Sequence, residues 1–436
     1  MSAMLRRYSP QLVDAALLDR TFVARHELVQ AVADDVEATV EQGGARFELL
    51  VGPRGSGKSH VLQVLLARLH VRLEGKAQIV ALGERTRVAS ALGLLSRVLA
   101  AMPELDNYPS TDEQIASLRD TPATAISRAV EMITARLQGR PLILAIEALD
   151  RVLVGLGKIG QARLRGILQT IGRWTIVGTA RVLGDTFTGI DYPFFNTFIE
   201  RRLPELTAQE CRALLAELAN VVADRRLCTA LKSTGGFSRV QTVRHLAGGQ
   251  PLVMVLLFPH LDGSSLDRVE PLMVDLCDDL TPLFDDRLDQ LPPGQAAIVD
   301  EMARSWRPMT VSTIARNTYA THQTTSGQLR YLLRDGTVRA LRIGRERFYE
   351  LADPLHRLMA GVRHDDDRAM TFIAFLADWY RHDCPPDLKA FGAPQALCDA
   401  HAALPGDARP WASLAEPERR VVAMVANKAQ TRALPR

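Results

Sequence analysis

A glycine-rich loop between an apolar run and a helical pattern most limits the folds open to this chain. Residues 47–60 read FELLVGPRGSGKSH. The run 47–51 has the composition of a buried strand, and residues 61–71 show the apolar periodicity of a helix. The order of strand, GxxxxGK[ST] loop and helix is that of a P-loop, which binds the phosphates of a nucleoside triphosphate with magnesium. The alternative is a chance glycine–serine turn before a helix.

Each position of this loop has a chemical reason. The glycines let the backbone curl so that its N–H groups point at phosphate oxygens. Lys58 brings a mobile positive charge to the β- and γ-phosphates, and the Ser59 hydroxyl can ligate magnesium. We therefore assign the binding of ATP and Mg²⁺ to the loop and the residue after it: Gly52, Pro53, Arg54, Gly55, Ser56, Gly57, Lys58, Ser59 and His60.

A P-loop also needs an acidic partner for the metal at the end of a neighbouring strand. Residues 142–147 read LILAIE, an apolar run that ends in the carboxylate of Glu147. We assign Glu147 to the magnesium side, either directly or through water. The next position, where a second acid would polarise the attacking water, is Ala148, and Asp150 lies further on. Glu147 and Asp150 can instead be read as ordinary loop acids.

The whole-chain composition is that of a soluble globular protein of two or three domains. Its 436 residues are 47% hydrophobic and 24% charged, and the net charge of +3 does not by itself indicate a nucleic-acid partner. The five cysteines lie far apart without a CxxC pair, which predicts neither a zinc site nor a disulfide framework. With no apolar signal-peptide core near the N-terminus and no apolar run of membrane-spanning length, we expect a cytoplasmic protein.

The order of strand-like and helical patterns predicts the fold class and the domains. Apolar runs at 47–51, 78–82, 142–146 and 175–178 alternate with helical stretches, as in an α/β protein with a parallel sheet flanked by helices. We expect this P-loop core to occupy residues 1–205. A mostly helical lid follows at 206–280, where Thr207 and Glu210 form a capping-box pattern. We place a C-terminal winged-helix domain at 281–363 and a helical tail at 364–436.

The winged-helix prediction rests on residues 292–362. Three helical stretches, 294–305, 311–319 and 323–334, precede two short alternating strands, 338–343 and 347–351, joined across Gly344. Three helices followed by a β-hairpin are typical of the winged-helix variant of the helix-turn-helix.

This stretch is far more basic than the chain as a whole. Nine arginines lie between Arg304 and Arg347, against the two acids Asp335 and Glu346. Short polar residues near the start of the third helix suit the major groove, and arginines on the hairpin suit the phosphate backbone of double-stranded DNA. The alternative is a winged helix that packs within the protein or binds another protein. The residues we assign to DNA are Thr321, Gln323, Thr324, Gln328, Arg330, Arg339, Arg342, Arg345 and Arg347.

Four segments together carry a family resemblance: TFVARHEL (21–28), GPRGSGKS, LILAIEALDRV and WTIVGTAR (174–181). Over residues 20–360 the chain resembles AAA+ and STAND-like ATPases of the origin-recognition and archaeal-ATPase type. The resemblance implies that Phe22, Val23 and Arg25 lie beside the adenine. It also implies that Thr179, at the end of a core strand, senses the γ-phosphate and acts with Lys58 and Glu147 in catalysis.

The resemblance extends to the lid. The segment AGGQPL (247–252) is similar to the lid motif of these ATPases, which brings Pro251 to the nucleotide. AAA+ members often carry an arginine where this chain has Leu252, and that departure is closer to the STAND pattern. Arg201 or Arg202 can act on the phosphate of a neighbouring subunit, or simply belong to a charged helix face.

These patterns predict ATP binding with slow hydrolysis, because one acid is missing and the loss of a general base lowers rates by about 10²–10⁴-fold. The leading hypothesis is an ATPase that couples nucleotide state to the binding of double-stranded DNA, with an ATP-dependent homo-oligomer. The alternatives are a STAND-like switch whose winged helix binds protein, and an ATP-regulated transcription factor.

Overall fold

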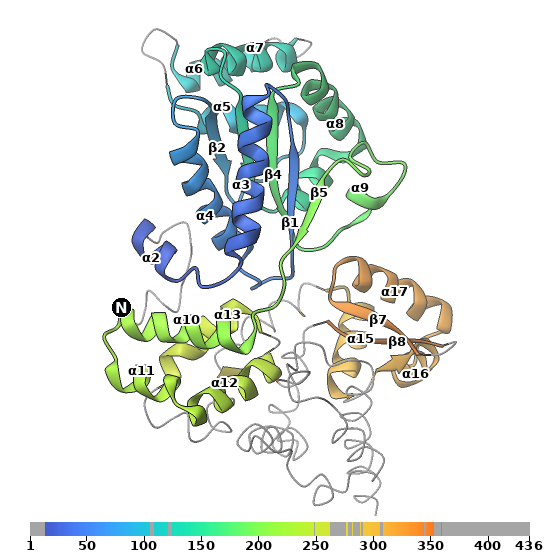
Figure 1. The fold of residues 1–436 in the computed structure, drawn as a ribbon. Coiled ribbons are helices and arrows are strands. Elements are labelled where there is room, and N and C mark those ends of the chain that lie inside the picture. The colour runs from blue at the N-terminus through green and yellow to red at the C-terminus, as the bar shows by residue number, and fades with distance from the viewer. Residues whose placement is uncertain are drawn as a thin grey trace, which may run out of the picture. The chain divides into compact units, whose positions relative to one another are not determined.

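The computed structural model describes residues 14–104, 109–120, 124–247, 249–261, 291–305, 308–343 and 346–352, together with 276–277, 281, 288 and 359. The chain divides into two compact units after Pro204, of which the first is Ser9–Pro204. Figure 1 shows the elements of both units.

A five-stranded parallel sheet forms the centre of the first unit. The strand order is β2-β3-β4-β1-β5, and the registers of all four neighbouring pairs are parallel. This confirms the predicted α/β fold with a parallel sheet. The strands are β1 (Phe47–Val51), β2 (Gln78–Leu82), β3 (Leu142–Ile146), β4 (Trp174–Ala180) and β5 (Ile199–Arg202).

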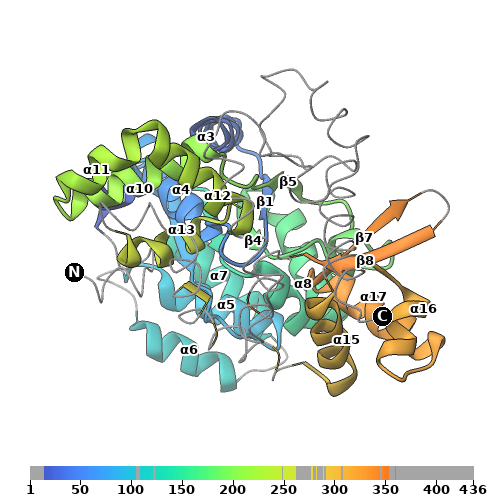
Figure 2. The same cartoon turned by 90° about the horizontal axis from the view of Figure 1, so that it is seen from below.

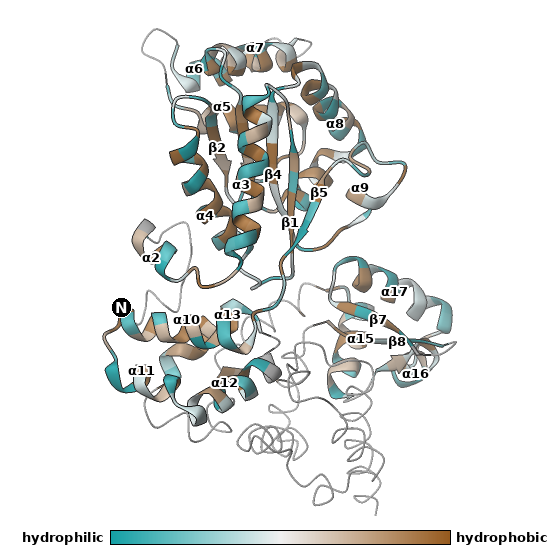
Figure 3. Cartoon of the chain, viewed as in Figure 1, coloured by the Kyte–Doolittle hydropathy of each residue, from teal (hydrophilic) through white to brown (hydrophobic). Residues whose placement is uncertain are grey.

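Helices cover both faces of this sheet. On one face, α3 (His26–Glu41) and α4 (Lys58–Arg72) pack with Leu50 and Val177 in one apolar cluster. On the other face, α5 (Ala91–Ala101), α7 (Ala125–Leu137) and α8 (Leu149–Ile171) pack with Leu49 and Ile176. In β3, neighbouring residues point to opposite clusters, so the residues on both of its sides are apolar and the strand reads as a continuous apolar run. Figure 3 shows α3 and α4 carrying both apolar (brown) and hydrophilic (teal) residues. The shorter helices of this unit are α2 (Ala15–Arg20), α6 (Thr111–Asp120) and α9 (Asp185–Thr188).

The second unit begins with a group of helices. The capping box predicted at its start is confirmed, since Thr207 accepts from the Glu210 N–H and the Glu210 carboxylate accepts from the Thr207 N–H. Gly249 has φ +64°, and a Cβ there would lie 2.6 Å from the Leu206 carbonyl oxygen, so no other residue fits. The helices are α10 (Ala208–Val221), α11 (Arg225–Lys232), α12 (Thr234–Ala247), α13 (Pro251–Leu257) and the 3₁₀ turn η2 (Phe258–His260).

Residues 293–351 form three helices and a three-stranded antiparallel sheet of order β6-β8-β7. Ile298, Leu329, Leu332 and Tyr349 lie in their shared apolar core. Figure 2 shows the hairpin of β7 and β8 beside α15 and α16. The elements are α15 (Pro293–Arg304), β6 (Met309–Thr310), α16 (Val311–Asn317), α17 (His322–Arg334), β7 (Val338–Ile343) and β8 (Glu346–Leu351). Arg345 and the predicted tail at 364–436 lie outside the described residues.

Two further findings concern the sequence predictions about membrane spans and cysteines. Where the structure describes a helix, its length and hydropathy fall short of what a bilayer crossing needs. Cys211, Cys228 and Cys277 are free thiols, and burial raises the pKa of Cys211 to about 12.

Candidate functional site

The glycine-rich loop joins β1 to α4, and its backbone explains the three glycines. Gly55 and Gly57 adopt φ +84° and +85°, a left-handed conformation that favours glycine. A Cβ on Gly52 would lie 2.6 Å from the Ser56 Oγ. Gly57 is the residue before α4, so the loop delivers its N–H groups at a helix N-terminus, which favours anions.

The Lys58 ammonium lies at the centre of the charged groups of this site. Its Nζ donates to the carbonyl oxygens of Gly52 (2.7 Å) and Pro53 (2.8 Å). Burial lowers the pKa of Lys58 to about 8, although Asp150, Glu84 and Glu147 each raise it, and the nearby Arg181 lowers it further. This ammonium is largely dehydrated and has acidic and basic groups near it. A phosphate oxygen can therefore replace the two carbonyl oxygens as its hydrogen-bond acceptor.

The structure brings Ser59 and Glu147 together from positions 88 residues apart. Ser59 Oγ donates to Glu147 Oε2 at 3.0 Å. Glu147 is buried at the carboxyl end of β3, and its N–H donates to the Leu82 carbonyl at 2.9 Å. A one-residue shift of the alignment would instead make Glu147 the water-polarising acid and put Ile146, which is fully buried and apolar, at the metal position.

This donor pair fits magnesium. A hydroxyl and a carboxylate are oxygen ligands, and magnesium typically takes one or two protein ligands and completes its shell with water and phosphate. Among the residues described, no three or more His, Cys, Asp or Glu side chains gather as a metal cluster would require. Ser59 and Glu147 are the residues that would hold the ion.

The end of β4 is tied to the start of α8. Ala148, at φ +51°, precedes α8, and its N–H donates to the hydroxyl of buried Thr179 at 2.9 Å. Two residues on, Asp150 Oδ2 accepts the backbone N–H of Arg181 at 3.3 Å. Thr179 thus lies beside the position of the missing second acid. The sequence analysis did not predict Arg181 as a site residue. Its one signal in the sequence is its position directly after the apolar run 174–180, the next such run after the one that ends in Glu147.

The segment predicted to lie beside the adenine contacts the loop. Phe22 is buried, and its ring centroid lies 5.5 Å from that of His60. Val23 is half-buried beside it. Burial lowers the pKa of His60, and its Nε2 donates to the Leu18 carbonyl at 2.8 Å. Pro53 and Arg54 are exposed at the loop surface, and Pro251 begins α13 in the second unit.

Arg25 has the most specific placement in that segment. It adopts φ +66° immediately before α3. Its Nη1 donates to the Ser56 carbonyl of the loop at 2.5 Å, and its Nη2 donates to the carbonyl of Pro204. Arg25 therefore links the loop to the last residue of the first unit.

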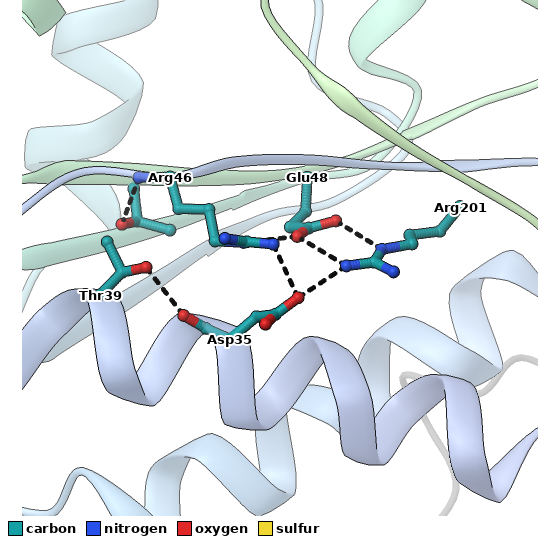
Figure 4. Close-up of polar contacts among 6 residues, drawn as sticks. Asp35, Thr39, Arg46, Glu48 and Arg201 are labelled. Carbon is teal, nitrogen blue, oxygen red and sulfur yellow. Dashed lines mark hydrogen bonds and ion pairs between the residues drawn. The ribbon is translucent and has the colours of Figure 1, made fainter.

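The charged-helix interpretation of Arg201 and Arg202 is wrong, because both lie on the edge strand β5. Arg201 is held inside its own subunit: it pairs with Glu48 at 3.0 Å and with Asp35 at 2.7 Å. Arg46 pairs with the same two acids (Figure 4). Arg202 is 75% exposed.

The residues assigned to DNA fall into two groups. Thr321 and Thr324 are exposed but engaged in capping α17, where the Thr324 N–H donates to Thr321 Oγ1 at 3.1 Å. Gln328 accepts from Gln295 at 3.0 Å, and Arg339 pairs with Glu350 at 2.5 Å. The other assigned residues within the described part are exposed to solvent: Gln323, Arg330, Arg342 and Arg347.

Two of these arginines lie directly opposite each other on the hairpin. Arg342 of β7 pairs in register with Arg347 of β8, whereas Arg339 faces Glu350. The described residues supply no acidic partner to Arg342 or Arg347, and the Arg347 guanidinium lies 5.5 Å from the Tyr349 ring centroid. Like charges directly opposite on neighbouring strands are destabilising, so an anion between them would relieve the repulsion.

Comparison with known proteins agrees with the P-loop site. Residues 21–164 match the family model of the AAA ATPase domain. The chain therefore contains an AAA-type ATPase domain with the nucleotide-binding fold of that class. A search of curated proteins finds no match.

Solved structures provide the second comparison. A Walker-type ATPase of Pyrococcus abyssi superposes with a TM-score of 0.53 at 14% identity, covering 75% of this chain and 94% of that one. Weaker likenesses include the Orc1 protein of Aeropyrum pernix in complex with DNA (TM-score 0.42, 16% identity, 82% and 98% covered) and Cdc6p of Pyrobaculum aerophilum (0.40, 13%, 84% and 98%). Because the sequence identity to the Walker-type ATPase is 14%, this likeness shows a similar fold and nothing further.

Proposed function

We propose that this chain is a slowly hydrolysing ATPase that couples its nucleotide state to the binding of double-stranded DNA. The observation that best supports ATPase activity is the 3.0 Å hydrogen bond between Ser59 and Glu147. It joins the loop hydroxyl to a carboxylate at the end of β3, the strand on the far side of β4 from β1, and this is the pair that a magnesium–triphosphate complex needs.

The roles of the site follow from this geometry. Ser59 and Glu147 hold Mg²⁺, which would neutralise charge on the phosphates when bound. Lys58 contacts the β- and γ-phosphates. Thr179 and Arg181 lie at the end of β4, where they contact the γ-phosphate, and Arg181 supplies a positive charge that Leu252 does not. Hydrolysis is slow because position 148 is alanine.

We assign residues 293–351 as the winged helix. Three helices with a three-stranded antiparallel sheet match that motif. The buried face of α17 carries Thr325, Leu329 and Leu332. Its outer stripe, at spacings of four, three and four residues, carries Gln323, Gly327, Arg330 and Arg334, a polar and basic surface suited to the major groove.

The opposed Arg342 and Arg347 support a phosphate contact by the hairpin. Both are exposed and in register, so one phosphate group can bind between them. Arg339 contributes less, because Glu350 already neutralises it.

Binding measurements test both parts of the proposal. Isothermal titration with MgATP should show binding that Lys58→Ala strongly weakens, and steady-state turnover should stay below about 1 s⁻¹. Fluorescence anisotropy with duplex DNA should show an affinity that changes with ATP and falls steeply with salt. No ATP binding by the parent chain contradicts the proposal, as does salt-independent binding to duplex DNA or none.

Removing the opposed arginines provides the sharper test of the DNA surface. The Arg342→Gln/Arg347→Gln variant should bind all duplex sequences more weakly and lower the salt slope by about 1, for the one phosphate contact that the two arginines share. The matched control is Arg304→Gln, on α15 of the same unit, where the arginine is already paired with Asp300. An equal loss in the control would mean that net charge alone sets the affinity.

A second function has one observation in its favour. The turn at Gly249 leads into Pro251-Leu252, without the arginine that AAA+ lids often carry, and so resembles the STAND pattern. A STAND-like switch would assemble with other protein chains on binding ATP. Light scattering that shows ATP-dependent assembly, with no DNA binding, would favour this function. The free thiols of the described residues support a cytoplasmic location for either one.

A further inference from the structure

Because position 148 is alanine, the role of polarising the attacking water has no residue assigned to it. Ala148 cannot polarise water, and Glu147 already accepts from Ser59. Because Ala148 turns the chain through a left-handed conformation, the next acid, Asp150, enters the first turn of α8 at the same end of the sheet. We propose that Asp150 polarises the water that attacks the γ-phosphate; this rests on the proposed ATPase function.

The first support is the position of the Asp150 carboxylate. Its Oδ2 accepts the Arg181 N–H at 3.3 Å, which fixes it to the end of β4, two residues beyond Thr179. The Lys58 ammonium is close by, since Asp150 contributes most among the acids that raise the pKa of that lysine, ahead of Glu84 and Glu147. Lys58 marks where the β- and γ-phosphates lie, so Asp150 borders the reacting end of the nucleotide.

The second support is an oxygen atom without a partner. Asp150 Oδ1 is buried, and the described residues offer it no hydrogen bond. A buried carboxylate oxygen in that state is costly, and native proteins usually satisfy it with water, an ion or a ligand. The attacking water is the ligand that the reaction would supply.

The proposed step is a balanced hydrolysis. The water oxygen forms a bond to the γ-phosphorus while the bond from that phosphorus to the bridging oxygen breaks, and the bond electrons leave with ADP. One proton of the water passes to Asp150 Oδ1 and then to the released phosphate. Asp150 ends the cycle as a carboxylate, and the products are ADP and inorganic phosphate.

Asp150→Asn tests this role with little change in shape, because the amide oxygen can still accept the Arg181 N–H. We expect turnover to fall at least about 10²-fold while the Kd for MgATP stays within about threefold. The matched control is Asp112→Asn, which removes an exposed acid from the first turn of α6 and should leave turnover unchanged. Ala148→Glu in the Asp150→Asn background should recover turnover at least about tenfold, by restoring a carboxylate nearby.

Three results would overturn the assignment. One is turnover of Asp150→Asn within about threefold of the parent. Another is a parallel loss of ATP affinity or thermal stability, which would mean that Asp150 only stabilises the start of α8. The third is a parent chain that binds MgATP but does not hydrolyse it. A parent chain that binds no MgATP would remove the proposed ATPase itself, so the two failures are distinguishable.

Discussion

At the residue scale, Lys58 makes nucleotide binding depend on pH. Its pKa is lowered to about 8, chiefly by burial, and only the ammonium form attracts phosphate. We expect the affinity for MgATP to fall as pH rises above 8, by up to about tenfold per pH unit, in titrations from pH 7 to pH 9.5. Lys58→Met should bind MgATP weakly, with an affinity that does not change with pH.

The same pKa shift of Lys58 makes the free protein more stable as pH rises from about 8 to 10.5, because the unfolded chain then binds more protons at this lysine. An equal slope in Lys58→Met would contradict the assignment to Lys58.

The same residues mark how far sequence prediction reaches. The loop spacing predicted Lys58 and Ser59, and an acid after an apolar strand predicted Glu147, because each signal is local. Arg181 and Asp150 meet through the pairing of distant segments, and nothing near either residue in the sequence predicts that the Lys58 ammonium lies close to both. A motif can predict only those site residues whose roles are fixed by their own short segment.

At the element scale, β5 is held to the sheet by charge. Its sequence IERR is polar and exposed, and this is why the apolar patterns predicted the other four strands and missed β5. Arg201 anchors it through Glu48, which is fully buried, and Asp35 (Figure 4). We expect Arg201→Ala to lower the free energy of unfolding by about 1–3 kcal/mol, since it removes hydrogen bonds to charged groups while Arg46 still pairs with Glu48. Arg202→Ala, one residue on and exposed, should stay within about 0.5 kcal/mol in the same urea titration. Equal effects would show that the ionic cluster does not hold the strand.

At the scale of the whole molecule, Pro204 is the residue at which the chain passes from the P-loop unit to Glu205 of the second unit, and we expect it to transmit an effect of ATP. Arg25 donates to the loop carbonyl of Ser56 and to the carbonyl of Pro204, so a change in the loop reaches the exit of the unit through one guanidinium. We expect Arg25→Ala to reduce the ATP-induced change in duplex DNA affinity by at least about half, measured at saturating ATP so that weaker nucleotide binding does not interfere. Arg25→Lys keeps the charge but loses the two-pronged geometry, and it should fail in the same way. Full coupling in both variants would mean that the nucleotide signal reaches the DNA surface by another route.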